Sequence, residues 1–520
     1  MSNDSSETAL FPPPASLPLD KICIAVQGAN PHEMMERAVA ALADAQFLEF
    51  RLDALAEPRG ALAPLREFLA AHREVTAIGT CRRRANGGSF DGALAEELEI
   101  LAEAAESGCR IVDLEIESAE AAQPAQIAAL RLRLRAAGTR LLVSYHDFTR
   151  THELETAAAR IAAFSPEIAK VVSTAKTLSD NLAILRLIEE KSRQGQFVGI
   201  AMGEEGLVSR VLGPRTGAAF TFASSGSGVE TAPGQVTAQA LRELYRLDEI
   251  DRETPIFGVA GNPICHSLSP LMQNAAFRAE GVKAVLLPLK VTEVADLVAL
   301  LRALPLAGCA VTMPLKVEIL PYIAKMDALT QRIGACNTLR VSSDGSIEGL
   351  NTDVAGVVRP LEKRLDLRGA KIALLGAGGA ARAAAFGLVD RGAEVFIVNR
   401  THASALALAA ECGAQALRHE DFATRSFDAL INSTPCGMKN AKQALPIAED
   451  ELNAGLVFDM VYNPLETPLL KLARCRGIAT IGGIEMFVQQ GARQFEVWTG
   501  KAAPAAEMLR VVEKALQQWA

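Results

Sequence analysis

Short apolar runs recur along the first half of the chain, and helical periodicity marks most of the segments between them. These segments are rich in Ala, Leu, Glu and Arg, as in 94–106 and 125–135. Strands that are apolar throughout belong to parallel sheets covered on both faces. The runs that we interpret as strands are 22–26, 47–52, 75–80, 111–115, 141–145, 168–172, 197–201 and 218–223. Eight strand and helix units in this rhythm predict an α/β fold that begins with a (β/α)₈ TIM barrel over residues 21–247.

The alternating pattern restarts twice in the second half of the chain. After residues 244–255, which are dense in Asp, Glu and Arg, a new apolar strand predicts a second α/β domain over 255–360. A further strand runs directly into a glycine-rich turn and predicts a Rossmann domain over 368–490. Residues 491–520 predict C-terminal helices. We expect them to pack on the 255–360 domain, although the pattern alone leaves either second-half domain open.

Composition and charge exclude several classes of protein. The chain has 520 residues, 49% hydrophobic and 22% charged, with a formal net charge of −8. No apolar run approaches the roughly 20 residues that cross a bilayer, and no basic stripe is present. We therefore expect no membrane span and no nucleic-acid partner. Residues 1–20 are polar and proline-rich, without the basic start and apolar centre of a secretory signal, and we interpret them as a disordered tail.

The cysteines indicate a reducing compartment. There are nine of them, scattered along the chain without a Cys-x-x-Cys pair. An odd number in this arrangement favours free thiols in the cytoplasm and argues against a disulfide frame or a zinc site. We expect no metal.

Polar residues at the C-terminal ends of the predicted strands are the candidates for chemistry, because barrels build their sites there. Glu49, Arg51 and Asp53 alternate along the second strand, so their side chains are expected to share one face. Lys170 places an ammonium inside an otherwise apolar strand. It is either salt-bridged in the barrel interior or an amine that desolvation makes nucleophilic toward a ketone. His146 is either structural or a proton carrier.

An ordered set of motifs resembles type I 3-dehydroquinate dehydratase across the whole predicted barrel. The motifs are Glu49-Phe50-Arg51-Leu52-Asp53, Thr80-Cys81-Arg82, Ser144-Tyr145-His146-Asp147-Phe148, Lys170, Ser209-Arg210 and Thr231-Ala232-Pro233-Gly234-Gln235. The resemblance implies that Lys170 forms an imine with the substrate and that His146 moves the proton. It implies that Arg210 binds the substrate carboxylate. The pocket residues that it implies are Glu49, Arg51, Arg82, Met202, Thr231 and Gln235.

One position departs from that family's pattern. The family usually has a glutamate before Gly-Gly, where it orients the histidine, and this chain has Asn86 before Gly87-Gly88. An amide cannot carry a charge and would stabilise an imidazolium less. We therefore expect slower dehydration, and a higher rate in Asn86→Glu.

The turn after residues 370–375 has the pattern Gly376-x-Gly378-x-x-Ala381. Such a pattern alone can be an ordinary turn, but here it follows a strand and opens a helix. The next strand ends in Asn399-Arg400-Thr401, where an NAD site would carry an acid. Arg400 is either a solvated surface residue or a partner of a 2′-phosphate, and we expect NADP. The cofactor-binding residues expected are Gly376, Ala377, Gly378, Gly379, Ala380, Asn399, Arg400, Thr401, Met460 and Gly483.

Motifs of residues 256–520, taken in order, resemble shikimate dehydrogenase. They are Ser267-Leu268-Ser269, Thr312-Met313-Pro314-Leu315-Lys316, Asn337-Thr338, Asn351-Thr352-Asp353, Asp459-Met460-Val461-Tyr462 and Met486-Phe487-Val488-Gln489-Gln490. Either serine could simply cap a helix. The resemblance implies that Lys316 and Asp353 form the catalytic pair and that the two serines hold the substrate carboxylate. The other substrate-binding residues that it implies are Thr312, Asn337, Thr352, Tyr462 and Gln490.

The two resemblances together imply a bifunctional enzyme of the shikimate pathway. It would dehydrate 3-dehydroquinate to 3-dehydroshikimate and then reduce that product with NADPH. Two alternatives stay open: quinate dehydrogenase activity in the second half, or a ligand-sensing regulator without catalysis. The oligomeric state cannot be inferred from the sequence.

Overall fold

The structure is a computed structural model that describes residues 19–226, 230–232, 234–304, 306–439 and 441–519. Most of the predicted tail, residues 1–18, lies outside the described residues. The chain forms two compact units, Met1–Thr254 with Leu289–Val291, and Pro255–Pro288 with Thr292–Ala520. Each unit is described by itself.

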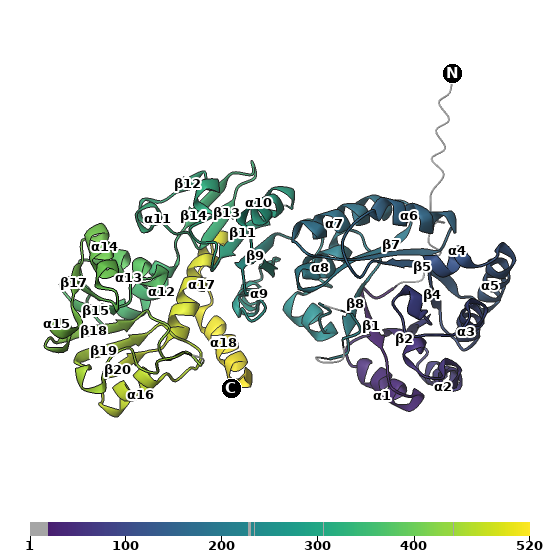
Figure 1. The fold of residues 1–520 in the computed structure, drawn as a ribbon, viewed down its shortest axis with the longest axis horizontal. Helices are drawn as coiled ribbons and strands as arrows, with labels where there is room; N and C mark the ends of the chain where they lie inside the picture. The colour runs from purple at the N-terminus through teal and green to yellow at the C-terminus, as the bar shows by residue number, and fades with distance from the viewer. Residues whose placement is uncertain (1–18, 227–229, 233, 305, 440, 520) are drawn as a thin grey trace, which may run out of the picture. The chain divides into compact units, whose positions relative to one another are not determined.

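The first unit is a parallel eight-stranded barrel, which confirms the fold class predicted for this half (Figure 1). Its strands are β1 Ile22–Val26, β2 Phe47–Arg51, β3 Thr76–Thr80, β4 Ile111–Glu115, β5 Arg140–His146, β6 Ile168–Thr174, β7 Gln196–Met202 and β8 Thr221–Ser224. The strand order is β7-β6-β5-β4-β3-β2-β1-β8, and β7 also contacts β8. The helices are α1 Pro31–Ala41, α2 Leu62–Ala71, α3 Leu94–Glu106, α4 Ile116–Ala121, α5 Pro124–Ala137, α6 Leu154–Ala163, α7 Ser179–Lys191 and α8 Leu207–Thr216. Figure 1 shows them around the outside of the strands.

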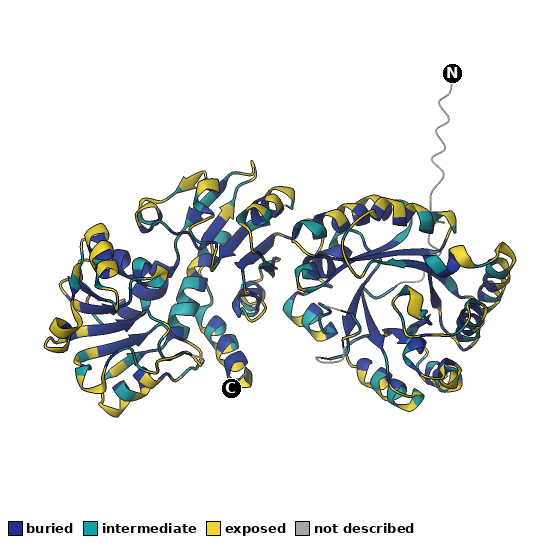
Figure 2. Ribbon diagram, viewed as in Figure 1, coloured by how far each residue is buried: buried dark blue, intermediate teal, exposed yellow. Residues whose placement is uncertain are grey.

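Burial follows from this arrangement, because the helices cover the outer faces of the strands. Every residue of β1, β4 and β6 is buried, and Figure 2 shows dark strands inside helices whose outer faces are exposed. Inside the barrel, Phe47 and Phe220 pack edge to face with ring centroids 4.8 Å apart. The register places Glu115 beside Ser144 and Ser144 beside Lys170. Side chains from β4, β5 and β6 therefore meet at one level of the barrel.

One prediction about β2 is wrong. The strand ends at Arg51, and Asp53 lies in the 3₁₀ turn Leu52–Ala54, so the three charged residues do not share one strand face. The turn brings the Asp53 carboxylate back onto the Arg51 guanidinium, with distances of 2.9 and 2.7 Å. Asp53 therefore supports Arg51 from outside the strand.

The second unit begins with a mixed six-stranded sheet of order β10-β9-β11-β13-β14-β12. Its strands are β9 Ile256–Gly261, β10 Val285–Lys290, β11 Leu306–Val311, β12 Lys325–Met326, β13 Thr338–Val341 and β14 Ile347–Leu350. β9 and β11 are parallel, whereas β13 runs antiparallel to both β11 and β14. Its helices are α9 Ser269–Ala279, α10 Val294–Ala303, α11 Ala328–Ile333 and α12 Asp353–Glu362.

A second, fully parallel six-stranded sheet follows, with the order β17-β16-β15-β18-β19-β20 of a Rossmann domain. Its strands are β15 Lys371–Leu375, β16 Glu394–Val398, β17 Gln415–Leu417, β18 Phe427–Asn432, β19 Ala454–Asp459 and β20 Ala479–Ile481. Its helices are α13 Gly379–Val389, α14 His402–Cys412, α15 His419–Ala423 and α16 Pro468–Cys475.

Two C-terminal helices complete the second unit, α17 Gly483–Thr499 and α18 Ala505–Trp519. α17 contacts α12, and α18 packs on α9. Met508 and Val512 of α18 share a core with Phe257 and Phe277 of the mixed sheet and α9. The C-terminal end of the chain is thus part of the substructure built on the mixed sheet.

The described residues contain neither a candidate membrane span nor a candidate metal site. Among the described parts of the chain, no helix is long and apolar enough to cross a membrane. In the same residues, no group of three or more His, Cys, Asp or Glu side chains could hold a metal ion. All nine cysteines carry free thiols.

Candidate active sites

The barrel contains a cavity at the C-terminal ends of its strands. The cavity brings together the barrel residues predicted to be catalytic or to bind substrate: Glu49, Arg51, Arg82, His146, Lys170, Met202, Arg210, Thr231 and Gln235. They come from β2, β5, β6 and β7, from the segments that follow β3 and β8, and from helix α8. The parallel arrangement of the strands gathers side chains that lie far apart in the sequence.

Lys170 lies in the middle of β6 and is 3% exposed. Its Nζ donates to Asp113 Oδ2 at 2.9 Å, lies 3.9 Å from Glu49 Oε1, and sits 4.3 Å from the centre of the Phe222 ring. The buried ammonium is therefore ion-paired, as one of the two interpretations expected. It also lines the cavity, as the other requires.

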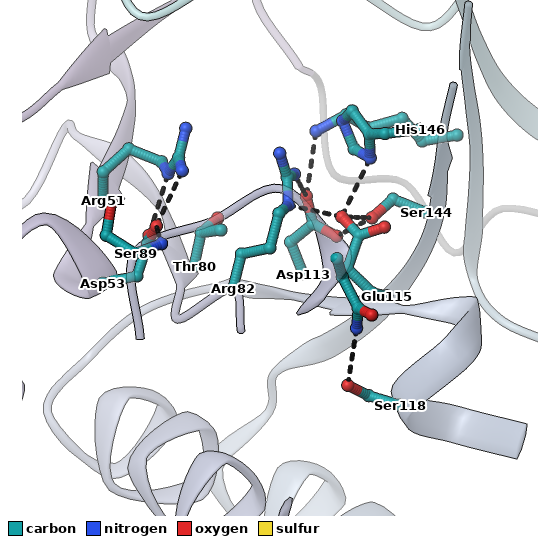
Figure 3. A network of polar contacts seen from close by, with 12 residues as sticks. Arg51, Asp53, Thr80, Arg82, Ser89, Asp113, Glu115, Ser118, Ser144 and His146 are labelled. Carbon is teal, nitrogen blue, oxygen red and sulfur yellow. Dashed lines mark hydrogen bonds and ion pairs between the residues drawn. The ribbon is translucent and has the colours of Figure 1, made fainter. Parts of the chain in front are cut away.

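His146 ends β5, and its Nδ1 lies 2.8 Å from Glu115 Oε1 (Figure 3). Its ring stacks on Phe148 with centroids 5.8 Å apart. Burial lowers the pKa of His146 well below its ordinary value, and the positive charges of Arg82 and Lys170 lower it further. The imidazole is thus neutral at neutral pH and can accept a proton.

Two buried acids on β4, Asp113 and Glu115, differ in how readily they hold a proton. Ser144 Oγ contacts both, at 2.5 and 2.9 Å. Burial alone would raise the pKa of Asp113, but the charges of Lys170 and Arg82 lower it, so that this carboxylate stays ionised. Burial raises the pKa of Glu115 in spite of Arg82, whose Nε lies 2.5 Å away. Glu115 therefore holds a proton more readily than Asp113.

The remaining cavity residues are held by their neighbours. Thr80 Oγ1 donates to Glu49 Oε1 at 2.8 Å. The Gln235 side-chain oxygen accepts from the backbone N–H of Thr231 at 2.8 Å. Burial lowers the pKa of the Arg210 guanidinium to about 10, and Arg210 is 1% exposed. A buried cation facing a cavity is suited to a substrate carboxylate.

The side chain of residue 86 contacts Ser118. Asn86 Nδ2 donates to Ser118 Oγ at 3.1 Å, and Ser118 Oγ donates to Glu97 Oε2 at 2.7 Å. The carboxylate beside His146 is Glu115. The carboxylate that can orient the imidazole is therefore Glu115, and the slower dehydration expected from Asn86 stays a prediction that the rate of Asn86→Glu tests.

In the second unit, the side chains of Lys316 and Asp353 form a pair. Lys316 Nζ donates to Asp353 Oδ2 at 2.6 Å, and Asn337 Nδ2 donates to Asp353 Oδ1 at 2.8 Å. Asn337 Oδ1 accepts from the backbone N–H of Thr352 at 2.8 Å. Thr312 directly follows β11, and its backbone N–H donates to Ala260. The network thus joins four of the predicted residues: Lys316, Asp353, Asn337 and Thr352.

The other predicted substrate residues have local partners. Ser269 is the first residue of α9, and its N–H donates to Ser267 Oγ at 3.3 Å. Gln490 Nε2 donates to the Phe487 carbonyl at 2.9 Å. Tyr462 stacks on Phe487 with ring centroids 5.4 Å apart. Both serines lie at the start of α9, where an anion is favoured.

The turn between β15 and α13 is a glycine turn with open space at the start of the helix. Gly376 has φ +111°, and a Cβ there would lie 2.6 Å from Ser433 Oγ. A Cβ on Gly378 or Gly379 would meet nothing within 4 Å, so there is open space at the N-terminus of α13. Backbone N–H groups at such a helix start can bind phosphate. Ala377 and Ala380 belong to the same turn and first helical turn.

The other residues predicted for the cofactor lie at the ends of β16 and β19. Arg400 and Thr401 follow β16 and are exposed, and Asn399 Nδ2 donates to the Thr401 carbonyl at 3.0 Å. Met460 follows β19. Gly483 starts α17, where a Cβ would lie 2.4 Å from the Met460 carbonyl oxygen. The residues present therefore fit a dinucleotide at the C-terminal edge of this sheet.

Comparisons with known proteins match both halves. The family described as Type I 3-dehydroquinase matches residues 22–252, and the Shikimate dehydrogenase substrate binding domain matches 259–339. The Shikimate / quinate 5-dehydrogenase family matches 360–442, and the Shikimate 5'-dehydrogenase C-terminal domain matches 483–513. A bifunctional 3-dehydroquinate dehydratase/shikimate dehydrogenase of Arabidopsis thaliana is 32% identical, over 95% of this chain and 84% of its own length. The chain belongs to this bifunctional family.

Other relatives match the second half of this bifunctional dehydratase/dehydrogenase. A shikimate dehydrogenase (NADP(+)) of Methanosarcina acetivorans is 43% identical over 50% of this chain and 99% of its own length. A shikimate 5-dehydrogenase of Thermus thermophilus, solved in complex with NADP(H) and shikimate, is 34% identical. That structure covers 50% of this chain and 100% of its own, with a TM-score of 0.47.

Sequence reasoning assigned no role to two acids of the bifunctional enzyme's barrel: Glu115 was noted only as a polar residue at the end of its strand, and Asp113 was missed. Asp113 contacts Lys170, and Glu115 lies beside His146. The signal was present, because the two acids alternate within an apolar strand and must share its inward face. Their partners could not be assigned without the register of β4, β5 and β6.

Proposed function

We propose that the two units catalyse consecutive reactions. The barrel converts 3-dehydroquinate to 3-dehydroshikimate, and the second unit reduces that ketone to shikimate with NADPH. The observation that carries the proposal is a buried lysine in a cavity, with a neutral histidine lining the same cavity. Membership of the bifunctional family supports both activities.

In the barrel, the ammonium of Lys170 first releases a proton to water, and the free amine then attacks the substrate ketone, whose oxygen leaves as water when the imine forms. The neutral His146 then removes a proton from the carbon beside the imine. The electron pair left on that carbon forms the ring double bond as the hydroxyl departs, and the imidazolium returns its proton to this hydroxyl. Water hydrolyses the imine and restores Lys170. Asp113 stays ionised throughout and holds the lysine nitrogen in place, and Arg210 binds the carboxylate of the substrate.

In the second unit, Ser267 and Ser269 hold the substrate carboxylate at the start of α9. Thr312, Asn337, Thr352, Tyr462 and Gln490 bind the ring. When bound, NADPH supplies hydride to the carbonyl carbon. Lys316, oriented by Asp353, donates a proton to the oxygen that gains negative charge. The pair at 2.6 Å supports this role, because the carboxylate fixes the direction of the ammonium.

The cofactor would lie on the turn from Gly376 to Ala380, with Asn399, Arg400 and Thr401 around the 2′-phosphate and with Met460 and Gly483 near the nicotinamide. The absence of an acid after β16 supports NADP over NAD. The relatives named as NADP(+) enzymes support the same choice.

A coupled assay with 3-dehydroquinate and NADPH tests the assignment of the two halves in the full-length protein. Lys170→Ala should lose dehydration while it still reduces added 3-dehydroshikimate. The Asp353→Asn variant should still form the conjugated enone, which is monitored by its ultraviolet absorbance. Its oxidation of NADPH should be at least tenfold slower than in the wild type. Loss of both activities in either variant, or turnover by neither half of the wild type, contradicts the proposal. The rates at which the enzyme oxidises quinate and shikimate with NADP, measured side by side, show which of the two polyols is its substrate.

A further inference from the structure

A buried chain of hydrogen bonds leads from α9 to the Lys316–Asp353 pair and includes two glutamines that the proposed reaction does not use. Gln273 of α9 is 0% exposed, and Gln494 of α17 is 2% exposed. Polar side chains buried this deeply are costly unless they are hydrogen-bonded. The chain belongs wholly to the second compact unit.

The directions of the hydrogen bonds at the two glutamines are fixed by backbone carbonyls, which can only accept. Gln273 Nε2 faces the Gly491 carbonyl at 2.9 Å, so the amide nitrogen of Gln273 must lie on that side. The same nitrogen lies 3.5 Å from Gln494 Oε1. Gln494 therefore presents its own amide nitrogen at the opposite end, 3.4 Å from the Asn337 carbonyl and 3.2 Å from Thr338 Oγ1.

The hydroxyl of Thr338 continues the chain of hydrogen bonds from Gln494 to Asn337. Because Thr338 Oγ1 accepts from Gln494, its proton is free to go to Asn337 Oδ1, which lies 2.8 Å away. Asn337 Oδ1 also accepts from the Thr352 backbone N–H, so the amide cannot turn over. Its Nδ2 then faces Asp353 Oδ1 at 2.8 Å, and Asp353 Oδ2 is left for Lys316.

We propose that Gln494 is a positioning residue of the reductase. It acts through Thr338 and Asn337 on the orientation of Asp353, and through Asp353 on the ammonium of Lys316. The inference rests on the proposed role of the Lys316–Asp353 pair as proton donor. Gln494 lies on α17, and Asp353 starts α12. The chain therefore couples the packing of α17 against α12 to the geometry of the reacting pair.

Two substitutions at position 494 separate hydrogen bonding from space filling. Gln494→Met keeps the length of the side chain and removes the donor, and Gln494→Glu keeps the shape but presents acceptors to Thr338 and the Asn337 carbonyl. Both should lower kcat for 3-dehydroshikimate reduction about tenfold, the effect of one lost orienting hydrogen bond. KM for the substrate and Kd for NADP, measured by calorimetry, should change less than twofold. Gln489→Met on the same helix is the matched control and should behave as wild type.

A double substitution tests whether Gln494 acts through the threonine hydroxyl. Thr338→Val interrupts the chain at its next member, and it also provides a second route if Gln494→Met folds poorly. If both act through one path, the double variant should be no slower than the slower single variant. A wild type that reduces no 3-dehydroshikimate would overturn the proposed function and this inference together. An active wild type with unchanged kcat in Gln494→Met and Gln494→Glu, or multiplying losses in the double variant, would overturn only the role of Gln494.

Discussion

At the scale of single residues, the barrel site depends on two neighbouring acids whose pKa values shift in opposite directions. Asp113 and Glu115 both contact Ser144, yet Lys170 keeps the first ionised while burial favours protonation of the second. Glu115 also lies beside His146 and Arg82. We therefore infer that Glu115, and not residue 86, sets the orientation of the imidazole.

Replacing Glu115 by glutamine should lower dehydration about a hundredfold, because a misoriented imidazole cannot move the proton efficiently. Asn86→Ala should cost less than fivefold, and Asn86→Glu should bring no gain, since residue 86 contacts Ser118. The measurement is the rate of enone formation, with 3-dehydroshikimate reduction in the same preparations as the internal control. Equal losses in Glu115→Gln and Asn86→Ala, or a faster Asn86→Glu, would contradict this assignment.

Glu97 should make the stability of the barrel depend on pH. It is fully buried on α3, and burial raises its pKa to about 7 although the Ser118 hydrogen bond opposes the shift. The folded protein then holds a proton that the unfolded chain releases. Its stabilising contribution is therefore complete below the ordinary pKa of a glutamate and is lost as pH rises through about 7.

Glu97→Gln should consequently raise the unfolding midpoint of the barrel at pH 8 by about 3 °C and have little effect at pH 5. Scanning calorimetry at the two pH values measures the difference. The exposed Glu67 gives the control Glu67→Gln, which should leave both midpoints unchanged. A Glu97→Gln protein that keeps the pH slope of wild type would show that Glu97 is not the titrating group.

At the scale of elements, the apolar runs predicted the strands well. β1 and β4 begin and end at the predicted residues, and β2, β3, β5, β6, β7 and β8 are shifted or extended by up to three residues at an end. The antiparallel β13 and β14 hairpin was not predicted, although Asp344-Gly345 marks a turn and Gly345 has φ +79°. Contacts such as Asp113 with Lys170 could not be predicted, because they depend on register across strands that are distant in the sequence.

The first residue of α17, Gly483, packs so closely against neighbouring backbone that a side chain does not fit there. A Cβ at Gly483 would lie 2.4 and 2.5 Å from the carbonyl oxygens of Met460 and Val461, which are backbone atoms that cannot rotate away. Gly483→Ala should therefore displace the first turn of α17, lower NADP affinity and reductase activity at least tenfold, and leave dehydration intact. At Gly482, the added Cβ meets only Leu470 Cδ1 at 3.8 Å, so Gly482→Ala is the matched control. Equal behaviour of the two variants in NADP titrations would contradict the close-approach argument.

At the scale of the whole molecule, each candidate site is built within one compact unit. All the cavity residues of the barrel belong to Met1–Thr254, and the Lys316 network belongs to the unit that contains α17 and α18. The ketone produced by the first reaction is the group that the second reduces. The two candidate sites have no residue in common. We therefore expect a substitution in one site to leave the activity of the other site unchanged.

The most direct test of the account is covalent capture at Lys170. Borohydride added to the full-length enzyme during turnover of 3-dehydroquinate should reduce the imine to a stable secondary amine. Mass spectrometry of the digested protein should then find the adduct on the peptide that carries Lys170, and no adduct in Lys170→Ala. A wild type that dehydrates its substrate but shows no adduct at Lys170 under these conditions would contradict the proposed chemistry of the barrel.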